Sequence, residues 1–214
     1  MLMMNKNTLF LQRINPVEMI EAKEKDPVSI YMESNPNPNS LKFVANKMLI
    51  QEGKSYDFPD IESAEFAPLA RELFTLDYVD RVFYMSNFVT VTKKENIEWV
   101  EIQNELKSKI KSFLESDKPL LTKEPEPYQP EIETVADSDT VARIKEVLDE
   151  YVKPAVEMDG GAIQFESFGE GVLKVNLQGS CSGCPSSTVT LKAGIENLLK
   201  KMVPEVKEVQ ALGV

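Results

Sequence analysis

The chain has 214 residues, enough for one medium domain or for two small domains that each bury a core. Hydrophobic residues make up 42% and charged residues 28%, which is ordinary for a globular protein and excludes a disordered or fibrous chain. The net charge of −11, from 24 Lys plus Arg against 35 Asp plus Glu, argues against binding to nucleic acid or to an anionic membrane surface.

Residues 1–27 form an N-terminal extension to which we assign no role. They include Glu18, Glu21 and Glu24, whereas organelle transit peptides are poor in acidic residues. The chain also shows neither a signal peptide nor a run of about 20 apolar residues that could span a bilayer. We therefore expect a cytoplasmic location, where paired thiols more often bind metals or carry out redox chemistry than form structural disulfides.

Residues 28–118 show the mixed periodicity of a small α+β domain, with period-2 segments, helical segments and turn-forming Asn and Pro residues between them. The expected elements are strands at 29–33 and 41–44, a helix at 67–74, a hairpin of 79–85 and 88–92, and a helix with the apolar stripe Trp99, Ile102, Leu106, Ile110 and Phe113. We expect this stripe to face the core.

Residues 119–136 are rich in Pro and Glu and show no apolar period. Pro125, Pro127 and Pro130 favour an extended polyproline II conformation. We interpret the segment as a semi-rigid linker between two domains.

Residues 137–214 predict a second domain with the order α-β-β-α-β. The expected elements are a helix over 141–152 that ends before Pro154, strands at 163–166 and 173–178, a helix over 188–202, and a last strand at 206–211. The predicted fold class is thus α+β, with two small domains joined by a Pro/Glu-rich linker.

The chain contains only two cysteines, Cys181 and Cys184, between a predicted strand and a predicted helix. It contains no histidine, which excludes imidazole bases, imidazole ligands and Cys-His nucleophile pairs. Pro185 suits the first position of a helix, and Gly179 and Gly183 allow sharp turns. Because free amides and the helix dipole favour negative charge, we expect both sulfurs to be stabilised as thiolates.

Two thiolates are half of the four ligands that a tetrahedral zinc ion or a cubane iron–sulfur cluster takes. Completing the set with protein ligands requires a second copy of the chain, so the composition predicts a site shared by a symmetric dimer. The residues alone do not separate iron from zinc, because thiolates suit both. A dithiol–disulfide pair and two inert buried cysteines remain as alternatives.

A second compact motif, Met158-Asp159-Gly160-Gly161, precedes the predicted hairpin. Its glycines favour a turn with positive φ angles. We interpret the motif mainly as structural, with a contribution to the surface around the cysteines as the alternative. No nearby residue completes a catalytic constellation with Asp159.

The second half of the chain resembles the NifU-like C-terminal domain of Nfu-type iron–sulfur cluster proteins. The resemblance rests on Met158–Gly161, on the tract Leu177–Ser187, and on the helix opening Thr188–Lys192. The first half is similar to the N-terminal domain of Nfu proteins of mitochondrial type, through the segments Asn35–Phe43, Pro68–Phe74 and Phe88–Thr92. Together the two motif sets cover the chain from about residue 28 to its end.

The resemblance implies a scaffold or carrier rather than an enzyme. It implies that a [4Fe-4S] cluster binds between two protomers of a homodimer, with Cys181 and Cys184 as the iron ligands. The expected partners are a scaffold that donates the cluster and the apo iron–sulfur proteins that receive it. We expect the first domain to help in choosing these partners.

Overall fold

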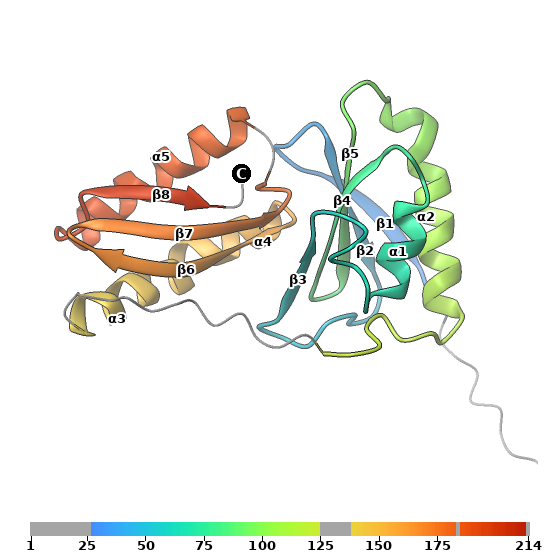
Figure 1. The fold of residues 1–214 in the computed structure, drawn as a ribbon, viewed down its shortest axis with the longest axis horizontal. Coiled ribbons are helices and arrows are strands. Elements are labelled where there is room, and N and C mark those ends of the chain that lie inside the picture. Colours follow the sequence, from blue (N-terminus) through green and yellow to red (C-terminus); the bar gives the residue numbers. More distant parts are fainter. Residues whose placement is uncertain (1–26, 125–137, 183–184, 213–214) are drawn as a thin grey trace, which may run out of the picture.

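The structure, a computed structural model, describes residues 27–124, 138–182 and 185–212. These residues build two sheets with separate hydrophobic cores, each combined with helices (Figure 1). The predicted α+β class is therefore confirmed.

The first sheet has five antiparallel strands in the order β1-β2-β5-β4-β3. Its strands are β1 (Ile30–Ser34), β2 (Ser40–Ala45), β3 (Ser55–Phe58), β4 (Val79–Met85) and β5 (Phe88–Lys93). The expected hairpin is present, with Ser86 at its turn in a left-handed conformation (φ 47°). The sequence analysis missed β3, because this strand has four residues and three of them are only half-buried.

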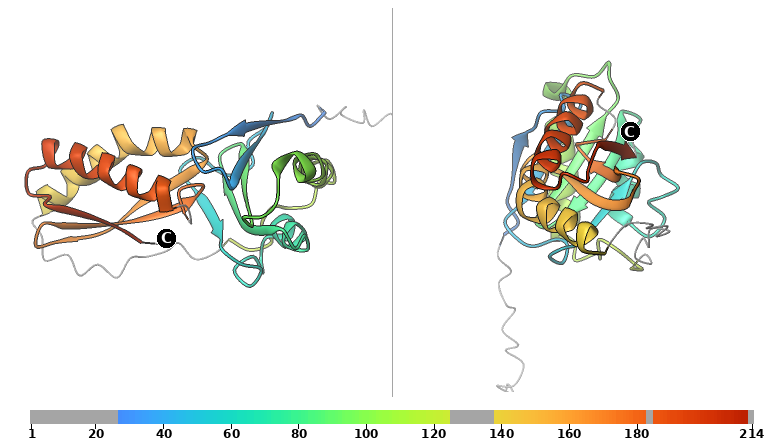
Figure 2. Two further views of the ribbon diagram at one scale, coloured as in Figure 1. Left: turned by 90° about the horizontal axis from the view of Figure 1, so that it is seen from above. Right: turned by 90° about the vertical axis from the view of Figure 1, so that its left-hand side faces the viewer.

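Two helices, α1 (Pro68–Phe74) and α2 (Trp99–Glu115), cover one face of this sheet (Figure 2). The apolar stripe of α2 is buried as predicted, except that Trp99 lies at the edge of the core. Alternate strand residues such as Phe43, Val82 and Val91 point into this core. The opposite face of the sheet is not covered by a helix of the first domain (Figure 2).

The second sheet has three strands, β6 (Gly161–Gly169), β7 (Val172–Gly179) and β8 (Glu208–Leu212), in the order β6-β7-β8. Strand β7 pairs antiparallel with β6 and parallel with β8. The chain passes from β7 to β8 through α5 (Pro185–Met202), which makes the crossover that parallel strands require. The expected order of elements in this half is confirmed.

The helical segment before β6 is longer than the sequence predicted. It runs from α3 (Ser138–Val147) through a π-helical turn (Leu148–Val152) into α4 (Lys153–Met158). The prediction that the helix ends before Pro154 is wrong. Proline stands in the first turn of α4, where its missing N–H costs least, and the wider π turn precedes it.

The predicted linker lies mostly outside the described residues, including its three central prolines. Its first part contacts the first domain. Leu120 and Leu121 pack against the first core, and the Thr122 backbone N–H donates a hydrogen bond of 2.8 Å to the Phe66 carbonyl.

Candidate functional site

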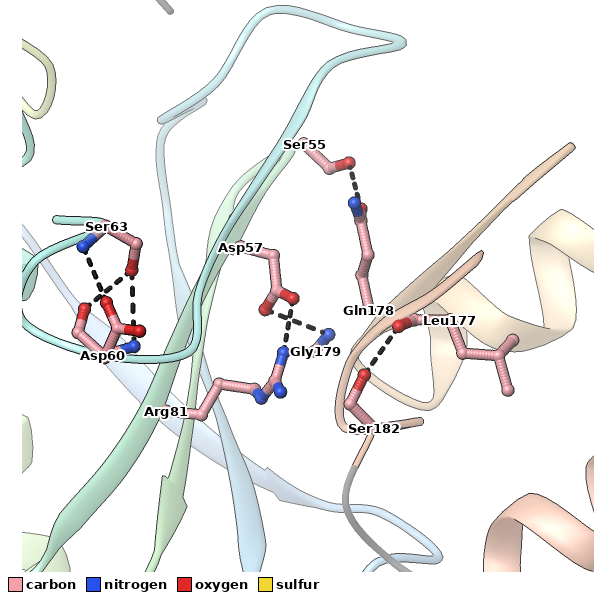
Figure 3. A network of polar contacts seen from close by, with 9 residues as sticks. All are labelled: Ser55, Asp57, Asp60, Ser63, Arg81, Leu177, Gln178, Gly179 and Ser182. Atoms are coloured by element: carbon pink, nitrogen blue, oxygen red, sulfur yellow. Dashed lines mark hydrogen bonds and ion pairs between the residues drawn. The ribbon is translucent and has the colours of Figure 1, made fainter. Parts of the chain in front are cut away.

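The site begins where β7 ends, in the segment 179–182, which we call the cysteine loop. Gly179 has φ +64°, the left-handed conformation expected of a glycine at a sharp turn. The Ser182 N–H bonds to the Gly179 carbonyl at 3.1 Å, and the Ser182 hydroxyl donates to the Leu177 carbonyl at 2.6 Å. These bonds fold the loop back over the end of its own strand (Figure 3).

Cys181 points into the second core and is 7% exposed. Burial raises the pKa of its thiol to about 11, against a weaker opposing effect from the Ser180 hydroxyl. The expectation of a stabilised thiolate is therefore wrong for Cys181 in this conformation, because removal from water penalises the charged form. Gly183 and Cys184 lie outside the described residues, so the expectation of a stabilised thiolate at Cys184 stays a prediction.

The two glycines of the Met158–Gly161 motif have different roles. Gly160 has φ +79° and forms the predicted turn. Gly161 lies next to Cys181. A Cβ atom on residue 161 would be 2.8 Å from the Sγ atom of Cys181 and 2.6 Å from the Gln178 carbonyl oxygen. The motif thus shapes the space around Cys181, the role that the sequence analysis had kept as its alternative.

The described residues contain no group of three or more Cys, His, Asp or Glu side chains that could hold a metal ion. The carboxyl group of Asp159 acts electrostatically on Cys181, and burial raises the pKa of this carboxyl. Cys181 itself is a soft sulfur donor of the kind that iron–sulfur clusters and zinc prefer. The donor set fits a thiolate-bound metal group, provided that further thiolates come from outside this described set.

The cysteine loop also contacts the first domain, which the sequence analysis did not foresee. The second domain lies against the face of the first sheet that its helices leave uncovered (Figures 1 and 2). The Asp57 carboxylate accepts hydrogen bonds from Arg81 at 2.5 Å and from the Gly179 N–H at 3.4 Å (Figure 3). The Ser55 hydroxyl and the Gln178 side chain lie 3.1 Å apart.

Apolar and polar groups share this contact between the domains. Val44, Phe83, Met85 and Phe88 of the first domain form a small buried cluster with Ala162 of the second. The sequence pattern pointed the other way, because β2 and β5 carry polar residues at alternate positions, which is typical of a strand with one face in water. Every residue of both strands is nevertheless buried, so both faces are covered.

Two family models match the chain. Residues 30–117 match the "Scaffold protein Nfu/NifU N terminal" model, and residues 144–210 match the "NifU-like domain" model. These ranges correspond to the two halves that the resemblance distinguished.

Several curated proteins are similar over most of the chain. A protein of Drosophila persimilis, "NFU1 iron-sulfur cluster scaffold homolog, mitochondrial", is 42% identical over 196 residues, which cover 90% of this chain and 68% of the relative. Its homologue in Drosophila willistoni is 40% identical over 210 residues, covering 98% and 66%. "NifU-like protein 4, mitochondrial" of Arabidopsis thaliana is 44% identical over 184 residues, covering 85% and 65%. The chain thus spans about two thirds of the length of these relatives.

Among solved structures, a NifU-like protein of Saccharomyces cerevisiae aligns with a TM-score of 0.43 at 20% identity, over 47% of this chain and 90% of that one. A protein of Staphylococcus aureus aligns with a TM-score of 0.34 at 14% identity, over 38% of this chain and 98% of that one.

In the described part of the chain, every helix is too short or too polar to cross a membrane.

The relatives correct the predicted location. They are named mitochondrial, which contradicts the expectation of a cytoplasmic protein. That expectation relied on the acidic residues within 1–27. The fold of the two domains does not indicate a compartment. The two family models and the identity over most of the chain establish that it belongs to the Nfu/NifU-like family of iron–sulfur cluster scaffold proteins.

Proposed function

We propose that this protein binds a [4Fe-4S] cluster between two copies of the chain, through Cys181 and Cys184 of each copy, and transfers it to apo-proteins. The observation that carries the proposal is the composition of the site. One chain offers two cysteines and no histidine, so it supplies at most half of the four thiolates that a cubane cluster takes. The names of the relatives support the coarser part of the proposal, that the chain is an iron–sulfur cluster scaffold.

The cluster is cargo in this scheme, and the chain supplies its binding and release. Binding requires the thiolate form, so the Cys181 thiol gives up its proton when it ligates iron. Release returns a proton to the Cys181 thiol once a client thiolate has replaced this cysteine as ligand.

The buried thiol weighs against a dithiol–disulfide oxidoreductase. An attacking cysteine in such enzymes is a partly exposed thiol with a pKa near or below neutrality. Cys181 is 7% exposed and its pKa is raised to about 11. In this conformation, burial and the raised pKa make Cys181 a poor attacking thiol at neutral pH.

The proposal is tested by anaerobic reconstitution with iron and sulfide, followed by native mass spectrometry. We expect a dimer that carries four iron and four sulfide ions in the wild-type protein. The Cys181→Ser and Cys184→Ser variants should lose the cluster and the cluster-dependent dimer, whereas Val100→Ala, at an exposed position of α2, should retain both. A monomer that holds a complete cluster, or a colourless dimer bridged by zinc, would contradict the proposal.

A further inference from the structure

The face of the first sheet opposite to α1 and α2 is a docking surface for the cysteine loop. We call it the docking face and define it by Asn37, Lys42, Asp57, Phe83 and Thr90. These side chains come from β2 to β5 and from the turn before β2, far from the cysteines in sequence. The occupant is visible in the structure, because the second domain of the same chain lies on this face (Figure 2).

The docking face forms hydrogen bonds with the backbone of Gly179 and Ser180, the two residues that precede Cys181. The Asn37 side chain, only 2% exposed, donates a hydrogen bond from Nδ2 to the Ser180 carbonyl at 3.0 Å. The Asp57 carboxylate accepts one from the Gly179 N–H at 3.4 Å (Figure 3). The first domain therefore supplies both a donor and an acceptor to the loop.

The same face holds the turn on which the loop rests. The Thr90 hydroxyl donates to the Gly160 carbonyl at 2.7 Å, and this carbonyl also accepts from the Ser180 N–H at 3.3 Å. The Lys42 ammonium lies 3.4 Å and 3.3 Å from the carbonyls of Glu157 and Met158, at the end of α4. A cation in this place is favourable, because the last carbonyls of a helix carry partial negative charge.

Close packing closes the remaining space. A Cβ atom on Gly179 would lie 2.8 Å from Cδ1 of Phe83, and one on Gly160 would lie 2.9 Å from Oγ1 of Thr90. The loop can therefore not move toward the first sheet while the domains are docked. With its backbone held on that side, Cys181 stays in the second core at 7% exposure.

A cluster that two chains share lies between their surfaces. A sulfur atom inside the core of one chain cannot reach it. We propose that the first domain is a latch that holds the cysteine loop closed, with Cys181 buried, and that undocking of the two domains exposes this thiol. The importance of the latch for cluster loading rests on the function proposed above. The latch itself concerns the protein without its cargo.

The sharpest test is Asn37→Asp. The Oδ1 atom of Asn37 accepts from the Asn39 N–H at 2.9 Å, a bond that the carboxylate keeps. The Nδ2 donor becomes a second oxygen that faces the Ser180 carbonyl, so attraction turns into repulsion. The assay is alkylation of Cys181 by iodoacetamide at pH 8, in the full chain with Cys184→Ser. We expect the rate to become about tenfold faster, because the docked state loses one buried hydrogen bond.

Thr92→Val is the matched control. Thr92 lies on the same strand and face as Thr90 and is also buried, but within the described residues its side chain makes no hydrogen bond to the second domain. Its alkylation rate should equal that of the parent protein. Equal rates for Asn37→Asp and for this control would overturn the latch.

Thr90→Val and Lys42→Met provide independent variants, in case Asn37→Asp does not fold. Valine matches threonine in size but cannot donate to the Gly160 carbonyl, and methionine retains much of the apolar stem of lysine without its charge. Both should speed alkylation of Cys181 and amide hydrogen exchange at Gly179 by severalfold. Unchanged exchange and alkylation in both variants would likewise overturn the proposal.

Reconstitution separates the latch from the function. With iron and sulfide, the Asn37→Asp chain with both cysteines intact should acquire its cluster several times faster than wild type. Faster alkylation without any cluster in wild type would retain the latch and overturn the proposed function. A cluster that forms at the same rate in both proteins, with unchanged alkylation, would retain the function and overturn the latch.

Discussion

The sulfur of Cys181 lies beside Gly161, at a place where a Cβ atom on residue 161 would be 2.8 Å from it. These two residues belong to motifs that are 20 positions apart and that β6 and β7 bring together as paired strands. The close approach makes the size of residue 161 a control on the position of the thiol.

Gly161→Ala should therefore destabilise the protein. The added methyl group would also meet the Gln178 backbone oxygen at 2.6 Å, which cannot move without disturbing the strand pair. Overpacking of this kind costs about 1 to 3 kcal/mol. Denaturant unfolding measures the loss, and Gly194→Ala in α5, where a Cβ meets no atom within 4 Å, should instead stabilise by up to about 1 kcal/mol. Equal unfolding midpoints for the two variants would contradict this packing.

Alkylation of Cys181 should depend steeply on pH. With a pKa of about 11, only roughly one thiol in ten thousand is ionised at pH 7, and the rate should rise about tenfold per pH unit up to pH 10. The Cys184→Ser variant isolates this thiol. The stability of the protein should change in the opposite direction. The folded state favours protonated Cys181, so the contribution of this thiol to the free energy of unfolding is lost as the pH rises through about 11. A rate that levels off near pH 8 would show an exposed, ordinary thiol.

Arg81→Met should destabilise the protein in a pH-dependent manner. Arg81 pairs with Asp57 at 2.5 Å, and burial already raises the pKa of this carboxyl. Without the guanidinium, we expect the pKa to rise further and the free energy of unfolding to fall by about 1.5 to 3 kcal/mol at pH 7. Because a protonated Asp57 has no charge to bury, the deficit should shrink toward pH 4.

The exposed pair Lys111–Glu115, with an N–O distance of 3.7 Å, provides the control for this charge effect. Lys111→Ala should change stability by less than about 0.5 kcal/mol at either pH. Urea unfolding at pH 4 and pH 7 measures both variants. A deficit for Arg81→Met that is the same at the two pH values would exclude the role assigned to Asp57.

Phe83→Ala should uncouple the two domains. Phe83 is fully buried between the first sheet and the second domain, and removal of such a ring costs about 3 to 5 kcal/mol. The chain has a single tryptophan, Trp99 in α2, so its fluorescence reports on the first domain alone. We expect the fluorescence and far-UV circular dichroism midpoints to separate in this variant and to coincide in Val100→Ala, which changes an exposed side chain. Coinciding midpoints in both would argue against coupling through Phe83.

Periodicity predicted most of the regular structure because the elements concerned are long or strongly patterned. The stripe of α2 and the hairpin of β4 and β5 are examples. The prediction failed for β3, which is short and pairs with β4 through contacts that its own four residues do not reveal. It also failed at Pro154. Proline is tolerated in the first turn of a helix, and the sequence does not reveal the π-helical turn that places Pro154 there.

By itself, the sequence determined the donor chemistry of the site. Two cysteines and no histidine limit one chain to two thiolate ligands and no imidazole ligand, whatever the fold. Only the tertiary structure decided the state of Cys181. It buries Cys181 in the second core and raises its pKa, and it places Asn37 within hydrogen-bond distance of the Ser180 carbonyl, 143 positions further along the chain. These properties arise from removal of water and from contacts between distant segments, which no local pattern of residues records.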